Sequence, residues 1–387
     1  MTLHLAAALD GAGWHPAAWR EASAAPRALF SARYWAGLVA EAERGLLDFV
    51  TIEDALGLQS SLPDGDDDRV DQVRGRFDAV LLAARLAPLT RGIGLVPTAT
   101  TTHTEPFHVA IGIATLDHVS GGRAGWRPQV SVRASDARHF GRRQFPPLDL
   151  SRVPDLSADP RVRALFAEAA DAVEVARRLW DSWEDDAEIR DVPTGRFIDR
   201  DKLHHIDFDG PFFSVRGPSI TPRSPQGQPV VTALAHARLP YEFAAAGADV
   251  VFVTPHSAEH ARAIVDEVRG LSGELKIFAD LVVFLGDDAA ARKARLDELD
   301  GAEFVSDAAI FTGTVRKLAD QLLEWRRAGI EGFRLRPGAV PYDLWQIASG
   351  LTAELRGRGA FRSRYEAGTL RGLLGLPRPA GRYAEAR

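Results

Sequence analysis

Threonines gather at the end of a short apolar stretch in the first third of the chain. The apolar run 93–96 has the character of a β-strand, and a threonine-rich segment follows it. A helix is expected over 106–118 and a further strand over 123–126, which gives strand–helix–strand order. In parallel α/β proteins the residues that follow the strands build the ligand site. Thr98 and Thr100 are therefore candidate ligand-binding residues.

A carboxylate and an imidazole near predicted strand ends offer acid–base chemistry. Asp54 follows the predicted strand 48–52, where it could face a ligand or cap the next helix. His103 directly follows the threonines and is a candidate catalytic residue, since imidazole is the commonest general acid or base. A metal site is not favoured here, because His103 and His108 do not share a helix face.

Two other clusters of titratable residues have simple structural explanations. The acidic run 64–68 reads DGDDD, but it lacks the closing glutamate of a calcium loop, so a solvated loop is predicted. The adjacent His204 and His205 would point to opposite faces of a strand, which favours structural roles. No metal site is predicted from this sequence.

The composition argues against several classes of function. Cysteine is absent, which excludes disulfides, cysteine nucleophiles and thiolate metal sites. The net charge is −6, so no broad attraction to nucleic acid or to an anionic membrane is expected. No window reaches the ~18 apolar residues of a membrane span, and no signal-peptide pattern is present. A cytoplasmic protein with a sizeable core is predicted, since 45% of the residues are apolar.

Short apolar strands alternate with amphipathic helices along the chain. Eight strands are predicted, which is the count of a (β/α)8, or TIM, barrel. A doubly wound sheet is not favoured, because no G-x-G-x-x-G follows the first strand. The strands are expected at 3–9, 48–52, 93–96, 123–126, 230–234, 250–253, 276–285 and 332–335.

Two long insertions interrupt the barrel pattern. They span about 127–160, after the fourth strand, and 185–228, before the fifth. The first is rich in arginine and proline without a clear period, and the second contains an expected hairpin at 205–215. Insertions this long are usually functional lids or disordered. Residues 1–357 are predicted to form a single barrel domain, with the tail 358–387 packing on the barrel.

Several motifs together resemble the bacterial luciferase-like flavin-dependent monooxygenases. The resemblance is to the branch that contains nitrilotriacetate monooxygenase, dibenzothiophene-sulfone monooxygenase and the large subunit of pristinamycin synthase. Taken together the motifs are highly specific, and they span nearly the whole chain. They are WHPAAWR (14–20), ARYWAGLVAEAERGLLDFV (32–50), TEPFHVAIGIATLDHVSGGRAGW (104–126), RRLWDSWEDDA (177–187), DKLHHIDFDGPFFSVRGP (201–218), PRSPQGQPVV (222–231) and LRGLLGLPRP (370–379).

The resemblance implies a TIM barrel that uses reduced FMN, which a separate flavin reductase supplies. Oxygen reacts with the reduced flavin and a small organic substrate is oxidised, while the protein orients the cofactor and excludes water. Homodimers and homotetramers are common in the family. By position, the resemblance places Asp54 near the flavin, Thr98 and Thr100 beside its ring, and His15 near the substrate. His15 thereby joins His103 as a candidate catalytic residue.

Some positions that face the FMN phosphate in the family carry other residues here. Arg127 follows the GGRAGW motif where the family has asparagine. Val162 and Phe166 stand where the family has a histidine and a tyrosine on one helix face. The run Ala235-His236-Ala237 replaces a G-x-S run whose glycine and serine approach the phosphate. Each lost hydrogen bond to a charged phosphate corresponds to roughly 1.5–3 kcal/mol, so binding could weaken by several kcal/mol.

These departures leave three interpretations open. In the leading one, the chain is a monooxygenase that binds reduced FMN, and arginines 127, 133 and 138 compensate for the lost donors, since an arginine fork binds phosphate well. Alternatively, the chain is a non-catalytic homologue with a role in binding or as the partner of another chain. A third possibility is an enzyme with another cofactor, such as a deazaflavin, or with none.

Overall fold

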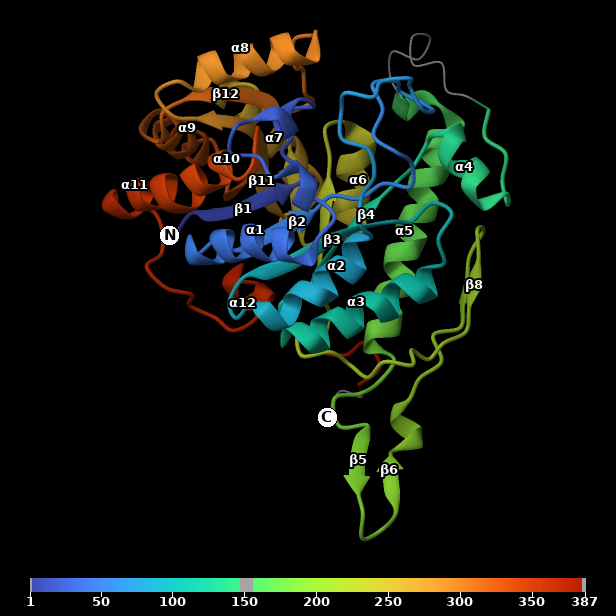
Figure 1. Ribbon diagram of the computed structural model, residues 1–387. Coiled ribbons are helices and arrows are strands. Elements are labelled where there is room, and N and C mark those ends of the chain that lie inside the picture. Colours follow the sequence, from blue (N-terminus) through green and yellow to red (C-terminus); the bar gives the residue numbers. More distant parts are fainter. Residues whose placement is uncertain (1, 147–155, 385–387) are drawn as a thin grey trace.

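Eight parallel strands close into a barrel in the computed structural model, which describes residues 2–146 and 156–384 (Figure 1). The strand order is β1-β2-β3-β4-β9-β10-β11-β13, and β13 pairs with β1 to complete the ring. The predicted (β/α)8 fold is confirmed. The strands are β1 (His4–Leu9), β2 (Phe49–Ile52), β3 (Gly94–Thr100), β4 (Gly125–Gln129), β9 (Val230–Leu234), β10 (Val250–Val253), β11 (Lys276–Leu285) and β13 (Gly332–Pro337).

Helices surround the barrel and bury apolar residues against it. The helix α1 (Ala32–Arg44) buries Trp35, Leu38, Val39 and Ala42, as its 3.6-residue period predicts. The other helices of the outer layer and its connections are α2 (Ala79–Leu86), α3 (Pro106–Ser120), α5 (Pro160–Asp181), α6 (Arg238–Gly247), α7 (Ala258–Leu271), α8 (Ala289–Asp300), α9 (Val315–Arg327), α10 (Tyr342–Trp345) and α11 (Thr352–Gly357).

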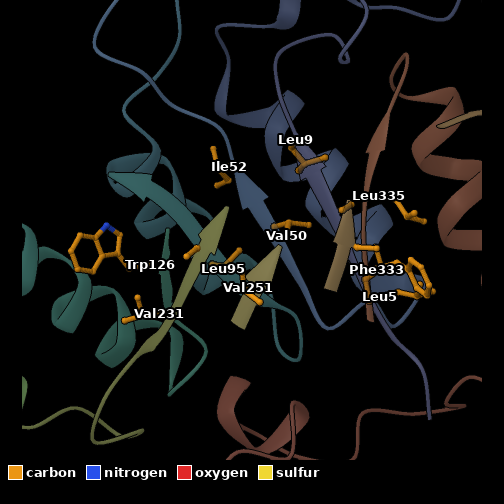
Figure 2. Packing of buried hydrophobic residues seen from close by; sticks show 14 of the residues in the cluster. Leu5, Leu9, Val50, Ile52, Leu95, Trp126, Val231, Val251, Phe333 and Leu335 are labelled. Atoms are coloured by element: carbon orange, nitrogen blue, oxygen red, sulfur yellow. The ribbon is translucent and has the colours of Figure 1, made fainter. Parts of the chain in front are cut away.

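The core has an outer layer between strands and helices, and an inner layer within the barrel. Leu5, Val50 and Val251 belong to the outer layer, which Figure 2 shows from close by. Residues at the alternate strand positions point inward, and the rings of Phe49 and Phe278 meet there at a centroid distance of 6.0 Å. The barrel interior is therefore a packed core and not a pore.

The C-terminal tail closes one end of the barrel. Its short helix α12 (Leu370–Leu373) places Leu370 in the same cluster as Phe49 and Phe278. These rings come from the amino-terminal half of the barrel, opposite the strand ends that carry the polar residues. The tail thus covers the amino-terminal end of the barrel, and the carboxyl end remains available to form a site.

The structure adds elements that sequence periodicity did not predict. Within the first insertion, α4 (Ala134–Phe140) begins where the carboxylate of Asp64 accepts hydrogen bonds from the amides of Ala134 and Ser135. A further strand, β12 (Ala309–Gly313), pairs with the outer part of β11. Both elements depend on contacts distant in sequence, so local patterning gives little sign of them.

Two hairpins lie in the second insertion. The predicted hairpin is confirmed as β7 (Phe208–Asp209) and β8 (Ser214–Val215). The hairpin of β5 (Glu188–Asp191) and β6 (Arg196–Ile198) was not predicted, and it projects away from the barrel (Figure 1). Among the helices of residues 2–146 and 156–384, none is long and apolar enough to cross a membrane.

Candidate active site

Charged side chains replace apolar ones inside the barrel toward the carboxyl ends of its strands. On β11, Asp280 is the next inward-pointing residue after Phe278, which belongs to the inner core. On β13, Arg334 and Arg336 occupy alternate positions and are at most 1% exposed. The apolar floor of the barrel is therefore covered by a polar layer.

The polar layer is a continuous set of ion pairs, which we call the mouth network. Asp280 accepts hydrogen bonds from Arg334 Nε at 2.8 Å and from Arg336 Nε at 2.9 Å. Arg334 Nη1 donates to Glu53 Oε1 at 3.0 Å, and Arg336 Nη1 donates to Asp307 Oδ1 at 2.6 Å. The mouth network comprises Glu53, Arg127, Asp280, Asp307, Arg334 and Arg336.

Arg127 joins this network from the middle of β4. Its Nη2 donates to Glu53, and its Nε donates to Thr98 Oγ1 at 3.0 Å. Burial alone would raise the pKa of Glu53, but the positive charges of Arg127, Arg334 and Arg336 outweigh burial and hold that pKa below its usual value. Glu53 is therefore ionised, and its charge keeps the Arg127 side chain inside the barrel.

A cavity of about 450 Å³ opens beside the network, between β4, β9, α5 and α6. Several positions that the sequence singled out line this cavity. They are Arg127, His236, Ala237, and the replaced positions Val162 and Phe166. Ala235, which directly follows β9, is fully buried and is not part of this lining. The remaining lining residues are Pro128, Gln129, Val130, Val132, Ser157, Leu234, Leu239, Pro240 and Phe243.

Gln129 supplies an unsatisfied polar atom in this wall. Gln129 lines the cavity, while its Oε1 is buried and accepts no hydrogen bond. Thr100, the register partner of Gln129 on β3, is buried beside it. A buried acceptor without a partner is unfavourable by about 1–3 kcal/mol.

Asp54 binds the start of α2, in line with one of its two predicted functions, although the N-cap residue of that helix is Asp78. Its Oδ2 accepts a hydrogen bond from the amide of Ala79, at the start of α2, at 2.9 Å, and its Oδ1 accepts from Ala55 at 2.8 Å. Burial raises the pKa of Asp54, while these two amides act in the opposite direction. Asp54 is absent from the cavity lining, and the neighbouring Glu53 is the carboxylate that faces the barrel.

His15 is held by two hydrogen bonds under α8. Its Nδ1 accepts from the amide of Ala17 at 3.1 Å, so the ring proton lies on Nε2, which donates to Asp297 at 3.0 Å. Burial lowers the pKa of His15 despite the nearby carboxylate. The ring packs against Phe284 and Phe304, away from the cavity lining.

His103 is buried with neither ring nitrogen hydrogen-bonded. Its backbone has φ of +69°, and its ring lies against Phe140 and Phe145 at centroid distances of 5.3 and 5.1 Å. Burial, reinforced by the charge of Arg143, lowers the pKa of His103. The structure thus places a neutral imidazole beneath α4, beside the cavity region and not within its lining.

Sequence reasoning missed most of the mouth network. Glu53, Asp280, Arg334 and Arg336 were not singled out, although two arginines alternating in the apolar strand GFRLRP were a visible signal. Arg133 and Arg138, the other arginines considered for phosphate binding, do not line the cavity. Among the described residues, no group of three His, Asp or Glu side chains could hold a metal ion.

Comparisons with known proteins agree with the architecture of this site. The structure superposes on that of long-chain alkane monooxygenase (LadA) with a TM-score of 0.84 and 24% identity, covering 97% of this chain and 96% of that one. It superposes on DmoA from Hyphomicrobium sulfonivorans with a TM-score of 0.82 and 24% identity, covering 98% and 94% of the two chains. At this identity the likeness establishes the fold.

Sequence comparison establishes the family. The chain is 30% identical, over a 450-residue alignment, to N-acetyl-S-(2-succino)cysteine monooxygenase of Bacillus subtilis (strain 168), covering 97% of each protein. It is also 30% identical to nitrilotriacetate monooxygenase component A of Aminobacter aminovorans, covering 96% of each. The family model for luciferase-like monooxygenases matches residues 12–332. The resemblance predicted from the sequence motifs is thus confirmed: the chain belongs to the luciferase-like monooxygenase family.

Proposed function

We propose that this protein is the oxygenase component of a two-component monooxygenase, which uses reduced FMN and O2 to oxidise a small organic substrate. Family membership supports the reaction class, and a relative at 30% identity is itself described as a component of a monooxygenase. The observation that carries the proposal is the cavity at the carboxyl end of the barrel, whose wall combines apolar side chains with Arg127, Gln129 and His236. A separate flavin reductase is the proposed partner.

The residues of the cavity fit a flavin ring. Apolar side chains of Phe166, Phe243 and Leu234 in the wall suit an aromatic ring system. The Gln129 side chain, which lines the cavity, would hydrogen-bond a polar edge of the ring or a ribityl hydroxyl. At the other wall, His236 and the first amides of α6 are the groups available to the terminal phosphate.

The chain's own contribution to catalysis is to bind, orient and exclude water. The apolar walls would keep water from the ring. The mouth network forms a polar layer at the carboxyl end of the barrel, and its positive and negative charges balance. When bound there, reduced FMN would supply the electrons that activate O2. His103 and His15 are retained as proposed catalytic residues, and His103 in particular has two ring nitrogens free to accept or donate a proton.

Anaerobic titration with reduced FMN tests the proposal. Micromolar binding, together with O2 consumption in the presence of a flavin reductase and NADH, is the expected result. Absence of binding at about 1 mM would contradict it and favour a non-catalytic homologue or another cofactor. Gln129→Leu should weaken flavin binding, whereas Gln144→Leu, outside the cavity lining, serves as the matched control. Light scattering on the same sample would show whether the protein is the proposed homodimer or homotetramer.

A further inference from the structure

We infer that the outward side of α2 and α3 is the contact between two copies of this chain, related by a twofold axis that sets their α2 helices antiparallel. The inference goes beyond the proposed activity, because it assigns a surface to the proposed homo-oligomer and uses no residue of the cavity lining. Three observations support it: the exposed apolar side chains of these helices, the scarcity of charge on α3, and the spacing of charge on α2.

Neighbouring elements on the outside of the barrel present large apolar side chains to solvent. The helices α2 and α3 lie side by side, and the short 3-10 helix η3 (Ala87–Leu89) directly follows α2 and also contacts α3 (Figure 1). Leu81 on α2 is 71% exposed, Leu89 in η3 is 51% exposed, and Val119 on α3 is 50% exposed. Apolar residues scattered singly over a surface are ordinary, whereas a group of them on adjoining elements marks an interaction site.

The helix α3 lacks the charged outer side of an ordinary barrel helix. Its one charged residue, Asp117, is buried. Ile111, Thr115 and Val119 follow one another at intervals of four residues, so they lie on one side of α3, and that side is partly or fully exposed. By contrast, the fully exposed positions of α9 all carry charged residues. The outer side of α3 therefore fits a partner surface that is equally poor in charge.

The outer side of α2 carries one acidic and one basic residue around an exposed leucine. Asp78, Leu81 and Arg85 are spaced at i, i+3 and i+7, so they lie along one side of the helix, and all three are exposed. The carboxylate of Asp78 accepts a hydrogen bond from the amide of Leu81 at 2.8 Å. Within residues 2–146 and 156–384, Arg85 has no ion-pair or hydrogen-bond partner. Arg85 is thus available to a carboxylate from outside the chain.

This spacing makes α2 complementary to itself. Leu81 lies midway between Asp78 and Arg85 to within one residue. Two α2 helices that cross antiparallel at Leu81 would therefore place each Asp78 opposite the Arg85 of the other copy, with the two leucines between the ion pairs. A twofold contact requires that one surface supply both halves of every interaction, and α2 does so. The charges on α2 therefore favour a second copy of this chain over a different protein.

Sedimentation velocity over a range of protein concentrations tests the inference. The unmodified chain is expected to associate, and Leu81→Asp should raise the dissociation constant of the dimer by about 100-fold or more, since both copies place this leucine at the centre of the contact. Val192→Asp, at a position 89% exposed in the β5–β6 hairpin, is the matched control and should leave association unchanged. A monomeric unmodified chain, or a Leu81→Asp chain that associates as before, would overturn the inference.

Reversing one charge on α2 tests the antiparallel pairing independently. Arg85→Glu places a carboxylate opposite Asp78 in both symmetric contacts and should weaken association by about tenfold at low salt and by less at high salt. Adding Asp78→Asn removes this repulsion and retains a capping side chain for α2, so it should recover most of the loss. If Asp78→Asn recovers nothing in the Arg85→Glu background, the two residues do not face each other and the proposed twofold contact is wrong.

Anaerobic titration of Leu81→Asp with reduced FMN separates this inference from the proposed function. Leu81 is outside the cavity lining, so the dissociation constant for reduced FMN should stay within about twofold of that of the unmodified chain. Lack of flavin binding by an unmodified chain that still associates through Leu81 would count against the proposed function alone. If the unmodified chain is monomeric and Leu81→Asp instead weakens its complex with the flavin reductase, this surface binds the reductase and the inference is overturned.

Discussion

Arg127 on β4 and Glu53 at the end of β2 meet inside the barrel, on either side of β3, in an ion pair that is almost fully buried. The position of Arg127 after the GGRAGW motif first made it a candidate substitute for lost phosphate ligands. Its contacts show a second role, in which it neutralises a carboxylate inside the barrel. This relationship gives the mouth of the barrel its balanced charge and makes the stability of the protein sensitive to either residue.

Replacing Arg127 should destabilise the fold strongly. Arg127→Ala leaves Glu53 buried with Arg334 as its remaining ion-pair partner, and breaking a buried pair is unfavourable by about 3–5 kcal/mol. Urea denaturation should show this loss as a lower midpoint. In a double-mutant cycle with Glu53→Gln, the double variant should lose at least about 1 kcal/mol less than the sum of the single variants. Additive losses would show that the two side chains are not coupled.

Asp54 should be a structural residue. Asp54→Ala removes the acceptor for the amides of Ala55 and Ala79 and should lower the free energy of unfolding by about 0.5–2 kcal/mol. Asp54→Asn retains an acceptor oxygen and should recover part of that loss. In both variants flavin affinity should stay within about twofold of the unmodified protein. A large drop in affinity with unchanged stability would instead support the flavin contact implied by the family resemblance.

His103 should make the protein sensitive to acid. Its pKa is lowered from 6.5 by burial, so below pH 6.5 the unfolded chain binds a proton that the folded protein resists. The contribution of His103 to the free energy of unfolding should therefore be fully present above pH 6.5. It should decline as the pH falls toward the lowered pKa of the folded state. His103→Phe keeps the stacking on Phe140 and Phe145 and should reduce this decline, with a change below about 1 kcal/mol at about pH 8.

Activity separates the structural role of His103 from a catalytic one. If the imidazole transfers a proton, His103→Phe should lower turnover by about 100-fold or more while the protein remains folded. His15→Gln is an informative comparison, because the pKa of His15 is also lowered by burial and its ring is hydrogen-bonded to Asp297. Unchanged turnover in folded His103→Phe would exclude the catalytic assignment.

Ala237 has the backbone of a capping residue without its side chain. Its φ and ψ of −155° and 169° nearly equal the −152° and 167° of Ser257, which caps α7 by accepting from His260. At α6 the equivalent third position is Pro240, which has no N–H to donate. Ala237→Ser alone should therefore change the free energy of unfolding by less than about 0.5 kcal/mol. In the Pro240→Ala background, where an N–H is present, Ala237→Ser should raise the free energy of unfolding by about 1 kcal/mol. Thermal unfolding of the four proteins would measure this difference.

The sequence by itself determined the barrel, its family and much of the cavity wall. Alternation of strands and helices specifies the fold because each strand buries both faces and each helix buries one. The positions Val162, Phe166, His236 and Ala237 were identified from motif spacing, and they converge on one cavity. Family motifs could locate these residues because the spacing along a helix or after a strand is a local property.

Tertiary structure alone decided which charged residues pair. Arg127 meets Glu53 across 74 residues of sequence, and His15 meets Asp297 across 282. The period of a strand determines that alternate residues point inward, but closure of the barrel determines which strands face each other at each level. Alternation puts Glu53 and Asp54 on opposite sides, and only the tertiary structure shows that Glu53 is the one inside the barrel.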